Sequence, residues 1–298
     1  MRRRHFLRLT TISAAAWITS GCSNTSAAPQ DSVYELGEDY FPNSVASGDP
    51  KASSVILWTR LVDDDAESLN LTVQLSVDDT FDEVLEHEVE LDAAHDGCAK
   101  VRVTELEAAS TYYYRFVYRK DGIAYTTRTG RTKTAPGADA DVPVRFAFVS
   151  CQDYIGRHYN LYRLIDEDEP DFIVHLGDYI YETTGDPLFQ GGAGGREVRF
   201  DDEAGAIVFN EGTEDQYFAA KSLDNYRQLY RIYRNDPALQ RVHERYPVVM
   251  MWDDHEFSND AHGATGTYFA GAQDEEDVER RKVANQAWFE YMPIDYRD

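Results

Sequence analysis

Three short apolar runs end in residues that bind metals or transfer protons, and this arrangement constrains the fold more than any other feature of the chain. The motifs that follow the runs at 144–149, 172–176 and 248–251 are Ser150-Cys151-Gln152, Gly177-Asp178-Tyr179-Ile180-Tyr181-Glu182 and Trp252-Asp253-Asp254-His255-Glu256. Short runs rich in Val, Ile and Phe predict buried strands. Because ligands bind beyond the carboxyl ends of strands in sheets flanked by helices, we expect these motifs to surround one point.

Each motif also has a simpler interpretation when it is taken alone. A Gly-Asp pair after a strand is usually a turn, and a cysteine such as Cys151 is more often a small buried hydrophobic residue than a ligand. The pair Asp254-His255 is compatible with a helix N-cap. Three such motifs, each directly after an apolar strand, are hard to produce by chance. The sequence therefore predicts one shared metal site.

At these residues the chain resembles the PhoD-like alkaline phosphatases, a family of the metallophosphoesterase superfamily. Gly177, Asp178 and Tyr181 fit the superfamily pattern Gly-Asp-x-x-Tyr, and the run 253–256 is the PhoD-like form of Gly-Asn-His-Asp/Glu. The pair 150–151 stands where the superfamily has its first aspartate motif. The resemblance extends from about residue 41 to the end of the chain. It implies an α/β (α+β) metallophosphoesterase-like domain, preceded by an all-β fibronectin-like sandwich.

The resemblance also implies a centre of two or more metals that hydrolyses phosphate monoesters or diesters with metal-activated water. Asp178 would bridge the metals, Cys151 and Tyr181 would hold Fe³⁺, and Asp254 would bind Ca²⁺ at the second site. His255 would donate a proton to the leaving group or a hydrogen bond to the phosphate. These roles agree with the chemistry, because one carboxylate can bridge cations about 4 Å apart and carboxylate oxygens suit Ca²⁺. Thiolate and phenolate ligands need a strongly charged metal to stay deprotonated.

The first residues are typical of an export signal. The run 3–8, Arg-Arg-His-Phe-Leu-Arg, fits the twin-arginine pattern, and the apolar stretch at 12–18 is too short and too polar to span a membrane. Residues 1–30 are therefore predicted to be a signal peptide for the twin-arginine export machinery, with a periplasmic, cell-surface or extracellular destination. The run 19–22 resembles a lipoprotein cleavage box that would make Cys22 a lipid anchor, and cleavage near residues 27–28 is the alternative.

The rest of the chain divides into two predicted domains. Residues 38–135 form the sandwich, with Tyr112 as the residue of a tyrosine corner and Trp58 in the sandwich core. Residues 142–298 form the N-terminal part of the metallophosphoesterase domain. Its predicted helices cover 223–233, a segment opened by Asp236-Pro237, and 277–291. The glycine-rich run 185–212 is predicted to be a long loop near the mouth of the site.

Three arginines, Arg227, Arg231 and Arg234, share roughly one face of the first of these helices. Two interpretations stay open for them, a solvated face or a phosphate-binding face. Cys98 and Cys151 are expected to be free, because a disulfide would consume a proposed iron ligand and would join different domains.

The net charge of −25 argues against binding the phosphate backbone of nucleic acid, because such proteins carry basic surfaces. Two classes of function are compatible with the chain. The first is an exported phosphoesterase, and the second is a catalytically idle exported fragment whose sandwich is a binding module. We expect the family's later ligands to be absent, since no histidine follows His262. Residues 1–298 alone are therefore expected to have at most weak phosphatase activity.

Overall fold

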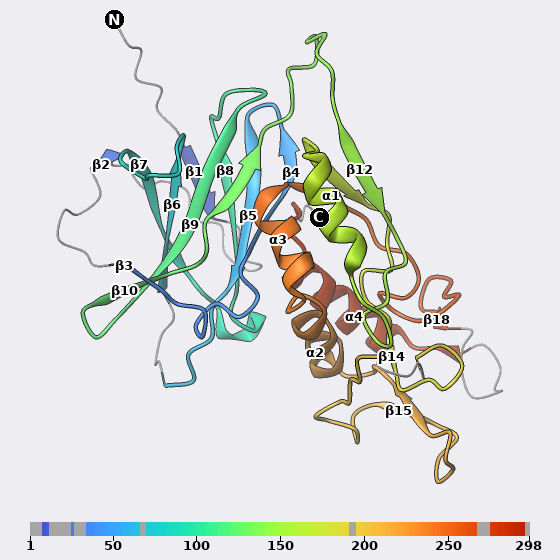
Figure 1. Ribbon diagram of the computed structural model, residues 1–298. Coiled ribbons are helices and arrows are strands. Elements are labelled where there is room, and N and C mark those ends of the chain that lie inside the picture. The colour runs from blue at the N-terminus through green and yellow to red at the C-terminus, as the bar shows by residue number, and fades with distance from the viewer. Residues whose placement is uncertain are drawn as a thin grey trace, which may run out of the picture.

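The computed structural model describes residues 8–11, 25–26, 34–65, 70–190, 195–266 and 275–295 (Figure 1). The twin arginines at 3–4, the lipidation candidate Cys22 and most of the predicted signal peptide lie outside the described residues. Among the helices that the structure describes, none is long and apolar enough to cross a membrane.

Two sheets pack face to face, and the apolar core of the sandwich lies between them. One has the order β2-β7-β6-β9-β10-β3, with β11 also pairing with β9, and the other begins β1-β8-β5-β4. The strands are β1 (Arg8–Thr11), β2 (Thr25–Ser26), β3 (Tyr34–Leu36), β4 (Val45–Lys51), β5 (Ser54–Arg60), β6 (Asn70–Ser76), β7 (Val84–Glu90), β8 (Cys98–Thr104), β9 (Thr111–Lys120), β10 (Ile123–Thr126) and β11 (Gly130–Lys133), with a 3₁₀ turn at Ala93–His95. Buried and partly exposed residues alternate along β8, which is the period-two pattern of a strand with one covered face.

The predicted tyrosine corner is present in this sandwich. The backbone N–H of Glu107 donates a hydrogen bond to the Tyr112 hydroxyl at 2.9 Å, and the Tyr112 ring is buried. The bond ties the start of β9 to the chain five residues upstream, as the motif requires.

Trp58, in contrast, does not fill the sandwich core, so that prediction is wrong. Along β5 the side chains of Val55 and Leu57 point into the sandwich core. Trp58 packs instead into a second apolar core, which is formed mainly by the second half of the chain. Its indole N–H donates to the Glu290 carbonyl at 2.8 Å, and the Arg234 guanidinium lies 3.8 Å from its ring centroid. The cause is the alternation of the strand, because adjacent side chains point to opposite faces and both faces of β5 are covered.

The sheet that contains β5 continues into the second half of the chain. Its full order is β1-β8-β5-β4-β17-β13-β12, and β12 (Phe146–Val149), β13 (Phe172–His175) and β17 (Val248–Met250) run parallel. These are the three predicted apolar runs. The junction is the parallel pairing of Val248 with Gly48. A Cβ at Gly48 would lie 2.3 Å from the Pro293 carbonyl oxygen, so the junction requires glycine.

Four helices accompany this second half (Figure 1): α1 (Asn160–Asp168), α2 (Leu223–Tyr233), α3 (Pro237–Arg245) and α4 (Val278–Tyr291). Ser222 and Asn225 form a capping box at the start of α2. The Asp236 carboxylate caps α3, and Pro237 occupies its first turn, as predicted. In Figure 1, α2, α3 and α4 lie beside the sandwich, and α1 packs against α3.

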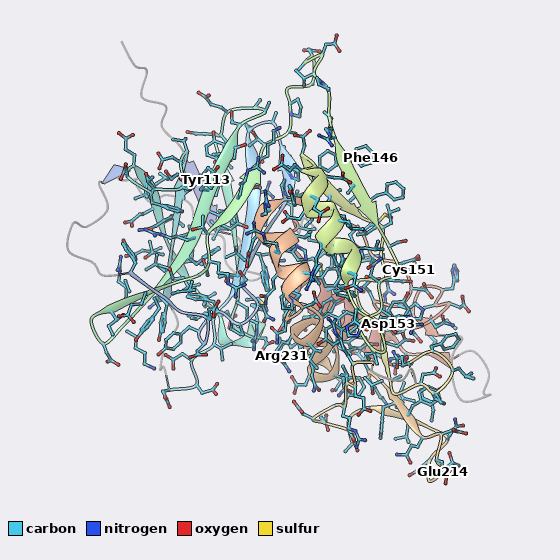
Figure 2. All side chains as sticks on the ribbon, viewed as in Figure 1. Tyr113, Phe146, Cys151, Asp153, Glu214 and Arg231 are labelled. Atoms are coloured by element: carbon cyan, nitrogen blue, oxygen red, sulfur yellow. The ribbon has the colours of Figure 1, made fainter. Side chains whose placement is uncertain are left out.

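The opposite face of the parallel strands is partly exposed. Phe146 and Phe148 of β12 are 56% and 69% exposed, and Val249 of β17 is 40% exposed. Figure 2 shows Phe146 at the strand that ends this sheet. An apolar sheet face of this kind favours association with other apolar surfaces.

The arginines of α2 are neither solvated as a group nor available for phosphate. Arg227 makes two hydrogen bonds of 2.7 Å to the Glu290 carboxylate, and Arg231 pairs with Asp96 at 2.9 Å. Arg234 is buried against Trp58. Both interpretations from the sequence are therefore wrong. These arginines link the helices to each other and to the sandwich.

The loop predicted at 185–212 contains one short strand in its described part, β15 (Ile207–Phe209). It pairs with β16 (Tyr217–Ala219), which also pairs with β14 (Thr183–Thr184). A last pair consists of β18 (Thr265–Gly266) and β19 (Glu275–Glu276).

Candidate metal centre

The three motifs meet because their strands are adjacent and end at the same edge of the sheet. Cys151, Gly177 and Asp178 all have positive φ angles, of 57°, 105° and 55°. Such angles are strained for residues with a Cβ and are found at functional sites. The Cys151 N–H donates to the Gly177 carbonyl at 3.2 Å. A Cβ at Gly177 would lie 2.4 Å from the Asp253 nitrogen, so this glycine allows the second and third motifs to approach each other.

Glu256 holds together the two loops that follow β13 and β17. Its carboxylate accepts hydrogen bonds from the backbone N–H groups of Asp178, Tyr179 and Asp253, at 3.1, 2.6 and 2.8 Å. Burial raises the pKa of Glu256 to about 7, against the opposing effect of these donors. Glu256 is part of the third sequence motif, but its role in linking two loops was not predicted. The reason is that its partners are backbone N–H groups, which every residue type except proline provides.

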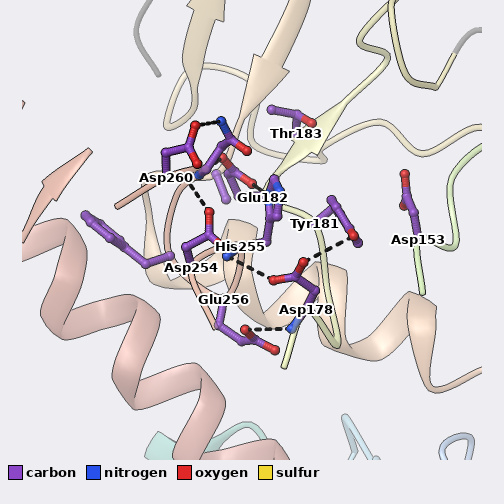
Figure 3. Close-up of polar contacts among 12 residues, drawn as sticks. Asp153, Asp178, Tyr181, Glu182, Thr183, Asp254, His255, Glu256 and Asp260 are labelled. Carbon is purple, nitrogen blue, oxygen red and sulfur yellow. Dashed lines mark hydrogen bonds and ion pairs between the residues drawn. The ribbon is translucent and has the colours of Figure 1, made fainter. Parts of the chain in front are cut away.

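Asp178, Asp254 and His255 form a cluster that can hold a metal ion (Figure 3), with one donor atom from each within 4.8 Å of the others. The His255 backbone N–H donates to Asp178 Oδ1 at 3.4 Å, and the Tyr181 hydroxyl donates to Asp178 Oδ2 at 3.3 Å. Burial raises the pKa of Asp178. The backbone N–H of Asp260 donates to Asp254.

Cys151 lies next to this cluster, at the end of β12 (Figure 2). A hydrogen bond with Ser150 lowers the pKa of its thiol, but burial and the neighbouring Asp178 carboxylate raise it, and the net shift is upward. Cys151 is exposed, and both it and Cys98 are free, as expected. The structure therefore brings together all four predicted ligands, Cys151, Asp178, Tyr181 and Asp254, along with His255.

Glu182 orients His255. The imidazole Nδ1 lies 2.7 Å from Glu182 Oε2, and the other carboxylate oxygen accepts from the Asn259 N–H at 2.7 Å. Glu182 is fully buried. Burial lowers the pKa of His255, but the Glu182 carboxylate outweighs it and the pKa rises to about 9. With Nδ1 directed at Glu182, the second nitrogen of His255 is free to donate to another group. Glu182 was part of the sequence motif, but no role for it was predicted.

The donor set fits a metal. Asp178 is a buried carboxylate, and its upward pKa shift reflects desolvation that a cation would offset. Burial also raises the pKa of Tyr181 above its ordinary value. The Tyr181 phenol and the Cys151 thiol would therefore become anionic ligands only beside a strongly charged cation. The carboxylate, phenol and thiol donors of Asp178, Asp254, Tyr181 and Cys151 together suit a transition metal with a harder cation beside it.

A cavity of about 510 Å³ opens beside the cluster. Its walls include Cys151, Tyr181 and His255, and also residues that sequence reasoning did not single out: Asp153, Arg157, His158, Leu161, Asp186, Phe189, Gln190 and Asn259. Three of these, Asp186, Phe189 and Gln190, belong to the start of the predicted long loop, so that this part of it lies at the site mouth, as expected. For the others, the only sequence signal was nearness to a motif, to Ser-Cys-Gln for the residues at 153–161 and to the run 252–256 for Asn259.

The fold and the site together define a class of protein, a β-sandwich that shares a sheet with an α/β layer carrying candidate metal ligands at its strand ends. Models of the PhoD-like phosphatase and of its N-terminal domain match residues 146–298 and 25–136. The chain belongs to the PhoD-like phosphatase family.

Two relatives support this assignment. Alkaline phosphatase D of Bacillus subtilis (strain 168) is 34% identical over 285 residues, which cover 92% of this chain and 44% of the relative. A solved structure described as "Structure of PhoD" aligns with a TM-score of 0.72 and 30% identity, over 88% of this chain and 47% of that one. The chain thus spans about half the length of these relatives.

Proposed function

We propose that this protein is a metal-dependent phosphoesterase that hydrolyses phosphate monoesters or diesters. The observation that carries the proposal is the cluster of Asp178, Asp254 and His255 at adjacent strand ends, with Cys151 and Tyr181 beside it. Membership of the PhoD-like phosphatase family and the similarity to alkaline phosphatase D support the same reaction.

Fe³⁺ and Ca²⁺ are the metals that we propose. Cys151 and Tyr181 are anionic ligands suited to Fe³⁺, Asp178 has two oxygens with which to bridge, and Asp254 offers a hard oxygen ligand suited to Ca²⁺. When bound, these cations would polarise the phosphoryl oxygens and lower the pKa of a water molecule.

His255 is the proposed proton donor to the leaving-group oxygen. Glu182 holds its Nδ1 at 2.7 Å, which fixes the ring orientation and favours the protonated imidazole. The Tyr181 ring lies 4.2 Å from the His255 ring, centroid to centroid, and limits its rotation further. The donor therefore needs little reorganisation when an ester binds.

We also propose that the protein acts outside the cytoplasm, in the periplasm, at the cell surface or beyond it. The support is the twin-arginine pattern at 3–8 and the candidate lipid anchor Cys22. Fractionation of cells that express the parent chain and an Arg3→Lys/Arg4→Lys variant tests this location. A parent chain found only in the cytoplasm would contradict the location, and equal amounts of both proteins outside the cytoplasm would contradict the twin-arginine route.

Hydrolysis of 4-nitrophenyl phosphate by the purified chain loaded with Fe³⁺ and Ca²⁺ tests the activity. We expect slow but saturable turnover that a chelator removes, and a loss of at least about 100-fold in Asp178→Asn. Asp224→Asn, an exposed aspartate in the first turn of α2, is the matched control and should match the parent. Turnover that persists with chelator, or that is equal in Asp178→Asn, would refute the proposal.

A further inference from the structure

An arginine and a histidine stand side by side at the mouth of the cavity beside the metal cluster. Arg157 and His158 line this cavity, and both are exposed. The hydrogen bond of the Arg157 guanidinium goes to the adjacent Gly156 carbonyl at 3.4 Å, and no carboxylate of the described residues forms an ion pair with it. The charge of Arg157 acts on the nearby Asp153 carboxyl without a direct ion pair, and in a chain of net charge −25 such a cation beside a cavity creates a local site for anions.

The acidic residues of the cavity, by contrast, are engaged by the protein itself. Both oxygens of Glu182 accept hydrogen bonds, from His255 and from Asn259. Asp153 accepts from the Tyr233 hydroxyl at 2.7 Å and from the Ile155 N–H at 2.9 Å. Asp186 is buried and accepts from the Leu188 N–H at 2.9 Å. The polar side chains available to a ligand at the mouth therefore include Arg157 and His158.

The turn that carries Arg157 and His158 is held at both ends. Ile155 and Tyr159 are buried, and the Tyr159 hydroxyl donates to the Gln152 carbonyl at 2.7 Å. Gly156 donates from its N–H to the Arg196 carbonyl at 3.0 Å. Arg157 and His158 lie between these anchors, so their backbone is positioned before any ligand arrives, which reduces the entropy cost of binding.

The cavity is larger than one phosphate group requires. Its volume of about 510 Å³ falls within the range of sites for small organic ligands. Leu161 and Phe189 line it and remain 56% and 63% exposed, so they offer apolar contacts to the body of an ester. An ester whose phosphate occupies the metal cluster would direct its leaving group toward this outer wall.

We propose that Arg157 and His158 form an anion-binding subsite that selects phosphate esters whose leaving group carries a second anionic group. Arg157 supplies a permanent charge and paired N–H donors, and His158 supplies a further N–H donor. The inference rests on the proposed phosphoesterase function, since the metal cluster must bind the first phosphate.

Two phosphonates test the subsite without turnover, because their carbon–phosphorus bond is not an ester bond. Calorimetric titrations would compare benzylphosphonate with 4-carboxybenzylphosphonate on the full chain loaded with Fe³⁺ and Ca²⁺. We expect the carboxylated probe to bind the parent about tenfold more tightly, as a charge-assisted hydrogen bond would provide. The variant Arg157→Gln/His158→Gln should lose this preference and keep its affinity for benzylphosphonate within about twofold. Arg163→Gln, which removes an exposed arginine of α1 outside the cavity lining, should keep the preference.

The outcomes separate the two proposals. If the parent binds both probes equally, or if Arg157→Gln/His158→Gln retains the preference, the subsite is refuted while the metal cluster still stands. If Arg163→Gln also loses the preference, the effect is one of overall charge and the subsite is again refuted. If the loaded parent binds no benzylphosphonate, the proposed function fails, and the subsite fails with it.

Discussion

Individual side chains hold the strand ends in the positions that the site requires, and Glu256 is the clearest case. Its carboxylate receives three backbone N–H groups from two loops. A glutamine at this position has one acceptor oxygen, and its amide nitrogen would face backbone donors. We expect Glu256→Gln to lower the free energy of unfolding by about 2 kcal/mol, as measured by urea denaturation.

The matched control for this prediction is Glu211→Gln, which makes the same change at an exposed position. Its free energy of unfolding should stay within about 0.5 kcal/mol of the parent value. If Glu256→Gln is as stable as this control, the three hydrogen bonds do not hold the loops together.

The site prediction agrees best with the structure at residues whose side chains commonly bind metals or transfer protons and that directly follow an apolar run. Cys151, Asp178, Tyr181, Asp254 and His255 were expected at one place because each follows an apolar run, and the structure groups them there. Glu182 and Glu256 stand in the same motifs. Their roles depend on which N–H groups and which ring they meet across the site, and that information lies in the tertiary structure.

Two buried histidines connect the elements on the inner face of the parallel sheet. His175 ends β13 and His243 lies on α3, and the Tyr179 hydroxyl lies 2.9 Å from His243 Nε2. Burial lowers the pKa of His175 to about 4 and lowers the pKa of His243 well below its usual range. Burial therefore favours the neutral imidazole at both positions.

These histidines should make the fold sensitive to acid. Because their folded pKa values lie below the unfolded value of about 6.5, the unfolded chain binds more protons as the pH falls below that value. We expect the free energy of unfolding to fall between pH 7 and pH 5, by about 2 kcal/mol from His175 and by a further amount from His243. Urea denaturation with chelator present, at several pH values, measures this dependence.

A variant comparison assigns this effect to the buried rings. His243→Asn should have a shallower pH dependence than the parent, whereas His262→Asn, at an exposed position, should not change it. An equal slope for His243→Asn and the parent would show that the buried His243 ring is not the source.

Element boundaries were largely predictable, but the surfaces that the elements cover were not. The Asp236-Pro237 pair predicted the start of α3 because a capping carboxylate and a proline in the first turn favour a helix N-terminus. Trp58 and the arginines of α2 were assigned wrongly for a common reason. Strand alternation and helical periodicity identify faces, but they do not say which other element packs on each face.

At the scale of the whole molecule, the two predicted domains share one sheet and one interface. β4 pairs with β17, and Trp58 is completely buried among Arg234, Glu290 and Tyr291. Such a junction couples the stabilities of the two parts. We expect a single cooperative unfolding transition, with circular dichroism and tryptophan fluorescence giving the same midpoint.

Trp58→Ala should lower that common midpoint, with a loss of about 3–5 kcal/mol, because it removes a large buried side chain at the junction. Two separated transitions in the parent chain would contradict the coupling, and would mean that the sandwich folds independently. The coupling depends on the pairing of Gly48 with Val248, which are 200 positions apart in the sequence. No local sequence pattern predicts a pairing over this separation.

If the three strand ends hold metal ions, the metal content of the purified chain will show it. The full chain would be loaded with Fe³⁺ and Ca²⁺, desalted and measured by elemental mass spectrometry, beside Asp178→Asn and the control Asp224→Asn. We expect the parent and Asp224→Asn to retain about one iron or more per chain with calcium, and Asp178→Asn to retain less than about a tenth of that amount, because it removes the carboxylate that would bridge the metals. A parent chain that retains no metal, or an Asp178→Asn variant that retains as much as the parent, would contradict the account.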